Sequence, residues 1–270
     1  MTKTRLRVLS LGAGVQSTTL ALMASKSEIG PMPDCAIFAD TQWEPQNVYD
    51  HLSWLESILP FPVHRVTAGS IREAILNKQN TTGGRFASVP YFTSNGGMGR
   101  RQCTSEYKIN PIEKKQRELL GYKPRQRIPV ASVEVWIGIS TDEIQRMKDP
   151  RNKWQVNRWP LIERRMSRQD CLKWMKDNGY PQPPKSSCIG CPYHSDRQWR
   201  EMRDFEPDAW SDACYIDSQM RLGGPVRGKR HAEYMHRSLK PLEEVDLTTP
   251  IEKGQHEFGF LQECDGMCGV

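Results

Sequence analysis

Residues 10–18 read SLGAGVQST, a glycine-rich turn between an apolar run and a helix-forming segment. The apolar run covers 5–11, and small and apolar residues continue over 17–24. Glycines allow a backbone to approach an anion closely, and a helix N-terminus offers unpaired N–H groups and positive potential. The stretch therefore predicts a strand, a phosphate-binding turn and a helix. A tight turn between strand and helix without any ligand is the alternative interpretation.

Strand and helix patterns alternate through the first half of the chain. The expected strands cover 5–11, 34–39, 62–66 and 133–138, and the expected helices cover 17–24, 46–59, 70–77, 108–120 and 167–175. Parallel strands require crossover connections, and the right-handed rule makes the expected fold a doubly wound α/β structure with a mostly parallel sheet. Ligands of such sheets bind at the carboxyl ends of the strands, where the loops 10–17, 40–44 and 138–146 lie.

The composition places the chain among ordinary globular proteins. Its 270 residues and 31.1 kDa suffice for a full hydrophobic core. The net charge of +6 suits an anionic partner without demonstrating nucleic-acid binding. No apolar run approaches the ~20 residues of a membrane-spanning helix. We therefore expect a cytoplasmic protein that makes no membrane contact. An α/β domain over 1–180 would carry the phosphate-binding turn, and an irregular, cysteine-bearing region over 181–270 would pack on it.

Eight cysteines suggest a metal or redox site. Cys188 and Cys191 form a C-x-x-C pair, and Cys264 and Cys268 lie close together in the tail. Such spacing is typical of metal or redox chemistry in a reducing compartment, where disulfides are rare. Three further cysteines lie in apolar or amphipathic segments and are expected to be packed thiols: Cys35, Cys171 and Cys214.

Later segments strengthen the interpretation of the glycine-rich turn. They read DTQWE at 40–44, CTSEYKINP at 103–111, GISTDEIQR at 138–146 and WPLI at 159–162. Together with the turn at 10–18, and in this order, they resemble the motifs of the phosphoadenosine phosphosulfate (PAPS) reductase family, within the PP-loop superfamily of adenine-nucleotide alpha-hydrolases. Each match is weak alone, but their common order makes the joint resemblance specific.

The resemblance implies an adenosine nucleotide, namely PAPS, APS or ATP, as substrate. The implied nucleotide-binding residues are Ser10, Gly12, Ala13, Gly14, Gln16, Ser17, Thr18, Asp40, Thr41, Gly138, Asp142 and Glu143, and the candidate anion-binding residues are Arg100, Arg101, Lys108 and Arg146. ATP-cleaving members of the superfamily carry an acidic residue where this chain has Gln16. This departure favours nucleotide binding without adenylation, while Asp40 is a carboxylate that could still hold a metal.

The resemblance also implies an iron–sulfur cofactor. A [4Fe–4S] cluster would be held by Cys103, Cys188, Cys191 and a tail thiol. By position, Cys264 matches the family's catalytic nucleophile, and Cys268 is then the fourth metal ligand. A cluster with three protein ligands is one alternative, and a zinc site that pins the tail is another.

The leading hypothesis is therefore an oxidoreductase in which a tail thiolate attacks an activated sulfonucleotide. A thioredoxin-like electron donor would complete the reaction and release sulfite. The first alternative is an ATP-dependent sulfurtransferase that modifies tRNA or DNA, for which the nucleic acid is the partner. The second alternative is a regulator that binds a nucleotide or a cluster without turnover.

Overall fold

A five-stranded parallel sheet forms the centre of the molecule. The computed structural model describes residues 4–83, 88–222, 231–248 and 252. The sheet has the order β3-β2-β1-β5-β6. Its strands are β1 (Leu6–Leu11), β2 (Cys35–Asp40), β3 (Val63–Thr67), β5 (Val133–Ile137) and β6 (Gln155–Arg158). With helices on both faces, this arrangement confirms the expected doubly wound α/β fold.

The alternation of side chains along each strand supplies two separate cores. On β1, Leu9 and Leu11 enter the core shared with the first two helices, whereas Val8 enters the opposite core. On β5, Trp136 enters the first core and Val135 enters the second. Both faces of the central strands are therefore buried, as expected for parallel strands covered by helices.

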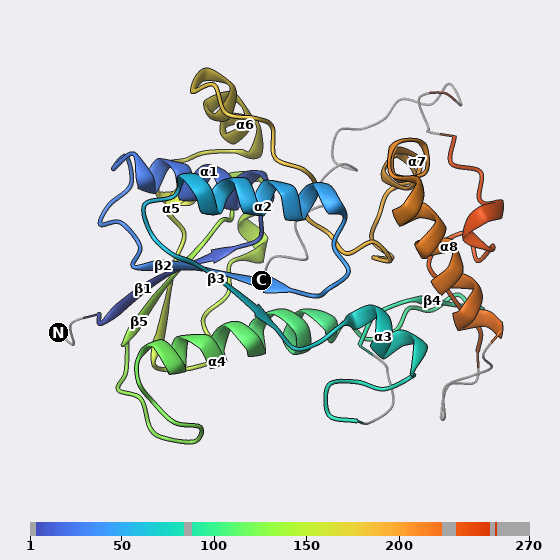
Figure 1. Cartoon of the computed structure of the whole chain (residues 1–270), viewed down its shortest axis with the longest axis horizontal. Helices are drawn as coiled ribbons and strands as arrows, with labels where there is room; N and C mark the ends of the chain where they lie inside the picture. The colour runs from blue at the N-terminus through green and yellow to red at the C-terminus, as the bar shows by residue number, and fades with distance from the viewer. Residues whose placement is uncertain (1–3, 84–87, 223–230, 249–251, 253–270) are drawn as a thin grey trace.

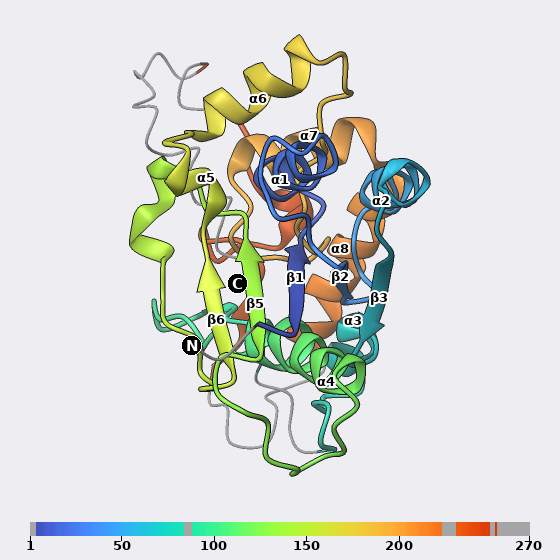
Figure 2. The same ribbon diagram turned by 90° about the vertical axis from the view of Figure 1, so that its left-hand side faces the viewer.

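Helices cover the two faces unequally (Figures 1 and 2). One face carries α1 (Val15–Ser25), α2 (Gln46–Ile58), α5 (Pro160–Glu163) and α6 (Arg168–Asp177). The other face carries α4 (Asn110–Leu119), which continues from the π-helix η1 (Thr104–Ile109). The 3-10 helix η2 (Thr141–Arg146) follows β5. The helix expected over 108–120 is thus two elements, η1 and α4.

A further group of elements lies beyond the carboxyl edge of the sheet, on the right in Figure 1. It contains α3 (Ile71–Leu76), α7 (Asp196–Phe205), α8 (Pro207–Leu222), the 3-10 helix η3 (Leu242–Glu244) and the two-stranded ribbon of β4 (Phe92–Thr93) and β7 (Glu233–Tyr234). Its core includes Trp43 and Tyr107 from the first half of the chain and Trp199 from the second. Segments distant in sequence therefore build this region together.

The sequence patterns predicted most of these elements. Ser70, at the start of the expected helix 70–77, accepts a hydrogen bond from the backbone N–H of Glu73, and Ser167 forms a capping box with Asp170. The edge strand β6 and the β4–β7 ribbon were not predicted from the sequence. Along the described part of the chain, no helix combines the length and apolarity needed to cross a membrane.

Candidate functional site

A pocket opens where the glycine-rich turn meets the end of β5. Strands β1 and β5 are neighbours in the sheet, and their chains continue to opposite sides, so this is the topological switch point. We call it the anion pocket. Its lining consists of Ser10, Leu11, Gly12, Gly14, Val15, Gln16, Ser17, Phe38, Ala39, Lys108, Ile112, Ile137, Gly138, Arg146, Arg168, Pro184, Lys185 and Ser186.

The turn is held in shape by local hydrogen bonds. The backbone N–H of Gly12 donates to Ser17 Oγ at 3.2 Å, and Ser17 Oγ donates to the carbonyl of Gly14 at 3.3 Å. Gly14 is the N-cap of α1 and supplies no side-chain cap, so the first amides of the helix face the pocket without a competing hydroxyl. The loop after β5 passes so close that a Cβ on Gly138 would lie 2.9 Å from the nitrogen of Ser17.

Among the residues that the structure describes, four basic side chains line the anion pocket and no carboxylate does. They are Lys108, Arg146, Arg168 and Lys185. Gln16 accepts a hydrogen bond from Arg168 at 3.1 Å and contacts Ser140 Oγ at 3.4 Å. The amide of Gln16 therefore orients Arg168 without neutralising its charge, which an acidic side chain at this position would do.

The carboxylates predicted for this site bond elsewhere. Asp40 accepts hydrogen bonds from Tyr49 Oη at 2.9 Å and from the backbone of Gln42 at 2.7 Å. Asp142 accepts from the backbone N–H of Arg168, at the start of α6. Glu143 is buried and pairs with Arg146 at 2.6 Å; burial raises the pKa of Glu143, while Arg146 opposes the rise. None of these three residues lines the anion pocket.

Two other predicted residues support the turn from behind. Ala13 is fully buried and adopts a left-handed conformation with φ of 56°. Thr18 is also fully buried, and its Oγ1 lies 3.0 Å from Nε2 of His51. Burial lowers the pKa of His51 to about 4, so this histidine is neutral at neutral pH. Both residues shape the turn instead of lining the pocket.

A second pocket lies beside the first and brings together three of the predicted metal ligands. We call it the thiol pocket. Its lining consists of Thr41, Trp43, Ile71, Val89, Pro90, Arg101, Cys103, Thr104, Lys108, Cys188, Gly190, Cys191, Pro192 and Tyr193. Lys108 lines both pockets. Cys103 precedes η1, whereas Cys188 and Cys191 lie in the loop between α6 and α7.

Trp43 holds the C-x-x-C turn on two sides. Its carbonyl accepts a hydrogen bond from the backbone of Ile189 at 2.8 Å, and its indole packs so closely that a Cβ on Gly190 would lie 2.0 Å from the ring. The indole Nε1 donates to Asp212 on α8 at 2.7 Å, and Arg72 on α3 donates to the same carboxylate. Elements from both halves of the chain thus fix the position of this turn.

His194 holds the same turn from the other side. Its Nε2 lies 3.0 Å from the carbonyl of Cys188, and its ring stacks on Trp199 with centroids 4.6 Å apart. Burial lowers the pKa of His194 to about 3, so the ring is neutral and Nε2 donates to the carbonyl. This histidine therefore contacts the backbone of Cys188 and gives the thiol turn a rigid support.

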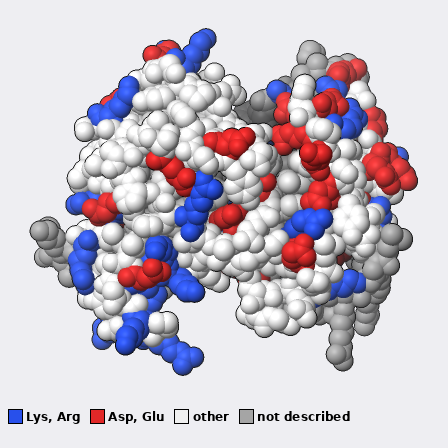
Figure 3. Space-filling model, viewed as in Figure 1, with Lys and Arg blue, Asp and Glu red and all other residues white. Residues whose placement is uncertain are grey.

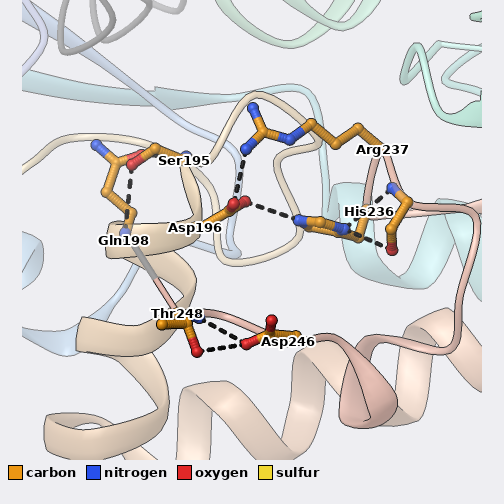
Figure 4. Close-up of polar contacts among 8 residues, drawn as sticks. Ser195, Asp196, Gln198, His236, Arg237, Asp246 and Thr248 are labelled. Atoms are coloured by element: carbon orange, nitrogen blue, oxygen red, sulfur yellow. Dashed lines mark hydrogen bonds and ion pairs between the residues drawn. The ribbon is translucent and has the colours of Figure 1, made fainter. Parts of the chain in front are cut away.

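The start of α7, four residues beyond the C-x-x-C turn, is tied to the segment 231–248 (Figure 4). Asp196 accepts from His236 at 2.9 Å and from Arg237 at 2.7 Å. Ser195 and Gln198 form a capping box on the same helix. This network anchors α7, and with it the loop that carries Cys188 and Cys191.

A buried polar network surrounds Cys188. Its Sγ lies 3.2 Å from Thr41 Oγ1 and 3.5 Å from Glu44 Oε1. Glu44 also accepts from Thr41 at 3.0 Å and pairs with Lys108 at 3.7 Å. Thr41 was predicted to bind the nucleotide, but the structure places it in the thiol pocket. The network links the thiols to the lysine that both pockets share.

Several buried polar atoms around the thiol pocket have no hydrogen-bond partner among the described residues. They include the acceptor Glu44 Oε2 and the donors Tyr91 Oη and Arg101 Nη2, of which only Arg101 belongs to a residue that lines the pocket. Within the same described ranges, no group of three or more His, Cys, Asp or Glu side chains is arranged to hold a metal ion. The three thiols line a common pocket, and unpartnered buried donors beside them favour a ligand that accepts hydrogen bonds.

The remaining predicted residues divide into two groups. Arg101 lines the thiol pocket, and its neighbour Arg100 is exposed and lines neither pocket. Cys264 and Cys268, the predicted nucleophile and fourth ligand, lie outside the described residues. Sequence reasoning did not assign Phe38, Arg168 or the segment 184–186 to the nucleotide site. The Pro184-Lys185-Ser186 approach to the turn depends on tertiary packing, and no local pattern indicates it.

On the face drawn in Figure 3, surface charge does not mark this site. Figure 3 shows acidic side chains gathered over the part with α7 and α8, and basic side chains near the N-terminal end of the molecule. On this face, the excess of positive charge thus lies away from the carboxyl edge of the sheet. The cations next to the glycine-rich turn are those that line the anion pocket.

Comparisons with known proteins give a distant likeness. No family model matches the chain, and no curated protein matches it in sequence. Among solved structures, it is similar to phosphoadenylyl-sulfate (PAPS) reductase from Candida auris, determined as a phosphate complex, with a TM-score of 0.42 and 15% identity. The match covers 67% of this chain and 76% of that chain. The fold assignment therefore rests on the strand order and the parallel pairing of the sheet itself.

Proposed function

We propose that the chain is an enzyme that binds an adenosine sulfonucleotide, PAPS or APS, in the anion pocket and reduces it with thiol chemistry next to that pocket. The observation that carries this proposal is the position of Lys108, which lines both the anion pocket and the thiol pocket. A nucleotide anion that contacts this lysine lies at the boundary between the two pockets. Binding and redox chemistry then share one cation.

The anion pocket supports the binding step. Its four cations and the amides of α1 provide charge-assisted hydrogen bonds to phosphate or sulfate oxygens. Because no carboxylate of the described residues lines the pocket, we expect protein groups to bind the anion directly, without a divalent cation. The amide at Gln16 agrees with a nucleotide whose alpha-phosphate is not cleaved. We therefore expect binding of the sulfonucleotide to be unchanged by EDTA.

The thiol pocket supports the redox step. Cys103, Cys188 and Cys191 would hold an iron–sulfur cluster, because thiolates are the usual ligands of iron in such clusters. The unpartnered donors Arg101 Nη2 and Tyr91 Oη suit a group rich in anionic sulfur. When bound, a [4Fe–4S] cluster would supply a metal centre that stabilises thiolates and helps to bind sulfate.

The proposed reaction balances with one external dithiol. The thiolate of Cys264 attacks the sulfur atom of the sulfonucleotide, the S–O bond to phosphate breaks, and the nucleotide leaves with the electron pair. Lys108 and Arg146 stabilise the charge gained by the leaving phosphate. A dithiol of the thioredoxin class then attacks the S-sulfocysteine, sulfite leaves, and the dithiol is oxidised to a disulfide.

The test uses anaerobically purified protein with PAPS or APS and a thioredoxin-like dithiol. We expect release of sulfite by the parent protein and no release by Cys264→Ser, with nucleotide binding retained. Cys214→Ser is the matched control, since this half-buried thiol lines neither pocket. Normal sulfite release by Cys264→Ser would reject the role of the tail thiolate.

The same preparation separates the alternatives. Metal analysis that gives about four irons per chain, with sulfide, supports the cluster. One zinc per chain supports the structural zinc site that pins the tail. Release of pyrophosphate from ATP only when tRNA or DNA is present would support sulfur transfer to nucleic acid. Nucleotide binding without turnover, either of the sulfonucleotide with a dithiol or of ATP with tRNA or DNA, would support a regulator.

A further inference from the structure

Arg101 is fixed at the wall of the thiol pocket. It precedes Cys103 by two residues, and its guanidinium carbon lies 5.5 Å from the ring centroid of Tyr193. This cation–π contact holds the guanidinium plane from one side. On another edge, Nη2 is buried and has no hydrogen-bond partner among the described residues. A buried guanidinium N–H without an acceptor is costly, so the pocket is built for an occupant that accepts a hydrogen bond.

Tyr91 supplies a second buried donor close to the three thiols, behind the residues that line the thiol pocket. Its side chain is 1% exposed, and its hydroxyl has no hydrogen-bond partner among the described residues. Backbone hydrogen bonds to Val89 and from Gly99 fix it between the strands of this region. Burial raises the pKa of Tyr91 well above its usual range, and negative charge on Cys191, Glu233, Cys103 and Cys188 acts in the same direction. The hydroxyl therefore stays protonated and within electrostatic reach of all three thiols.

We propose that Arg101 and Tyr91 are hydrogen-bond donors to the iron–sulfur group held in the thiol pocket, and that they raise its reduction potential. This inference rests on the cluster part of the proposed function and adds two tuning residues to it. The physical reason is charge: one-electron reduction adds negative charge to the cluster and its thiolates. A nearby cation and a hydrogen-bond donor stabilise the reduced form more than the oxidised form.

The other charged groups beside the pocket do not replace this contribution. Glu44 and Lys108 form a pair with 3.7 Å between Oε1 and Nζ, so Glu44 offsets part of the lysine charge on the side of the thiols. Glu44 is a carboxylate and can donate no hydrogen bond while ionised. The guanidinium of Arg101 is always charged. Of the two predicted arginines, Arg100 is exposed and faces neither pocket.

The test measures the midpoint potential of the cluster, followed by absorbance or electron paramagnetic resonance during titration with dithionite. Parent protein, Arg101→Gln and Tyr91→Phe are reconstituted anaerobically and assayed first for iron and sulfide. We expect equal iron content and a more negative potential in both variants, with the larger shift for Arg101→Gln because it also removes a charge. Arg101→Lys restores the charge and is expected to recover part of the shift.

Two matched controls make the result specific. Arg100→Gln makes the same charge change on the adjacent exposed residue, and Tyr122→Phe removes the hydroxyl of a tyrosine whose oxygen accepts from Arg5. Both are expected to leave the potential unchanged. Equal potentials in parent, Arg101→Gln and Tyr91→Phe at full iron content would overturn the inference. If Arg101→Gln fails to load iron, Tyr91→Phe decides the outcome by the same measurement.

Failure of the inference is distinguishable from failure of the proposed function. A parent protein that takes up no iron and sulfide overturns this inference together with the cluster part of the proposal. Nucleotide binding by that same preparation, measured by calorimetry, decides the anion-pocket part separately. A cluster with unshifted potentials overturns only the tuning roles of Arg101 and Tyr91.

Discussion

The anion pocket and the thiol pocket meet at Lys108, yet they are built differently. The anion pocket centres on one continuous turn, residues 10–17, and on the end of the neighbouring strand at Gly138. The thiol pocket is assembled from the loop after β2, the start of α3, the segment 89–104 and the loop 188–193. A site made from backbone amides can be encoded locally, whereas a site made from side chains depends on long-range packing.

The two pockets also differ in how they tolerate change. In the anion pocket, the determinants are backbone N–H groups and several cations, so that loss of one cation leaves the others in place. In the thiol pocket, a single turn is wedged between Trp43, His194 and the elements behind them. We therefore expect graded losses of affinity in the first pocket and abrupt structural losses in the second. The following predictions test that difference, beginning with the largest effect.

Gly190→Ala is expected to have the largest effect. Its new Cβ would lie 2.0 Å from the indole of Trp43, a ring held by Asp212 on its other edge, so the turn must move. We expect destabilisation at or above the upper end of the ~1–3 kcal/mol range for overpacking. Urea unfolding measures this, with Gly12→Ala as control because its Cβ would meet only Ser17 Oγ at 3.7 Å. Equal urea midpoints for the two variants would show that the indole of Trp43 does not hold the turn at Gly190 in place.

Arg168→Gln is expected to weaken nucleotide binding about tenfold or more without unfolding the protein. A hydrogen bond to a charged group contributes about 1.5–3 kcal/mol, and 1.4 kcal/mol corresponds to a factor of ten in affinity. Isothermal titration with PAPS in EDTA provides the measurement. Arg164→Gln is the control, because Arg164 is exposed and donates to the carbonyl of Glu28. Similar losses in both variants would point to a nonspecific effect of surface charge.

Acid is expected to destabilise the support behind the anion pocket through His51. In the folded chain, burial lowers the pKa of His51 from 6.5 to about 4, so the unfolded chain binds more protons between these values. The stabilisation is complete above pH 6.5 and is lost as the pH falls toward 4, at up to about 1.4 kcal/mol per pH unit.

Urea unfolding near neutral pH and in mild acid checks this expectation. His51→Gln is expected to lose less stability than the parent over the same interval. In His51→Gln, the slope of unfolding free energy against pH should decrease without vanishing, because burial also lowers the pKa of His194. An identical pH dependence in parent and variant would show that His51 is not buried and neutral in the folded chain.

The smallest effects are expected from the two capping boxes, one beside each pocket. Ser167→Ala removes the cap of α6, and Ser195→Ala removes the cap of α7. Each is expected to cost about 1 kcal/mol of stability. Only Ser167→Ala is expected to weaken nucleotide binding as well, because Arg168 is the first residue of α6. A comparable loss of affinity in Ser195→Ala would show that the pockets are coupled more strongly than their separate construction implies.

Much of the fold and part of the site could be predicted from sequence, for reasons that particular residues illustrate. Apolar runs of strand length, such as 34–39, predicted strands because both faces of a parallel sheet are buried. Strand β6 was not predicted, since Gln155–Arg158 is a polar edge strand with no such run. Asp142 and Glu143 follow β5 as expected, but neither lines the pocket: Asp142 accepts from the backbone N–H of Arg168, 26 residues further along the chain, and Glu143 pairs with Arg146.

By itself, the sequence determined the glycine-rich turn and the doubly wound sheet, because glycine spacing, helix starts and strand periodicity act between near neighbours. Only the tertiary structure decided that Cys103 shares a pocket with Cys188 and Cys191, and that Lys108 joins this pocket to the turn. The reason is distance along the chain: contacts between such remote segments depend on the packing of whole elements. Local patterns specify the elements, and their packing decides which side chains meet.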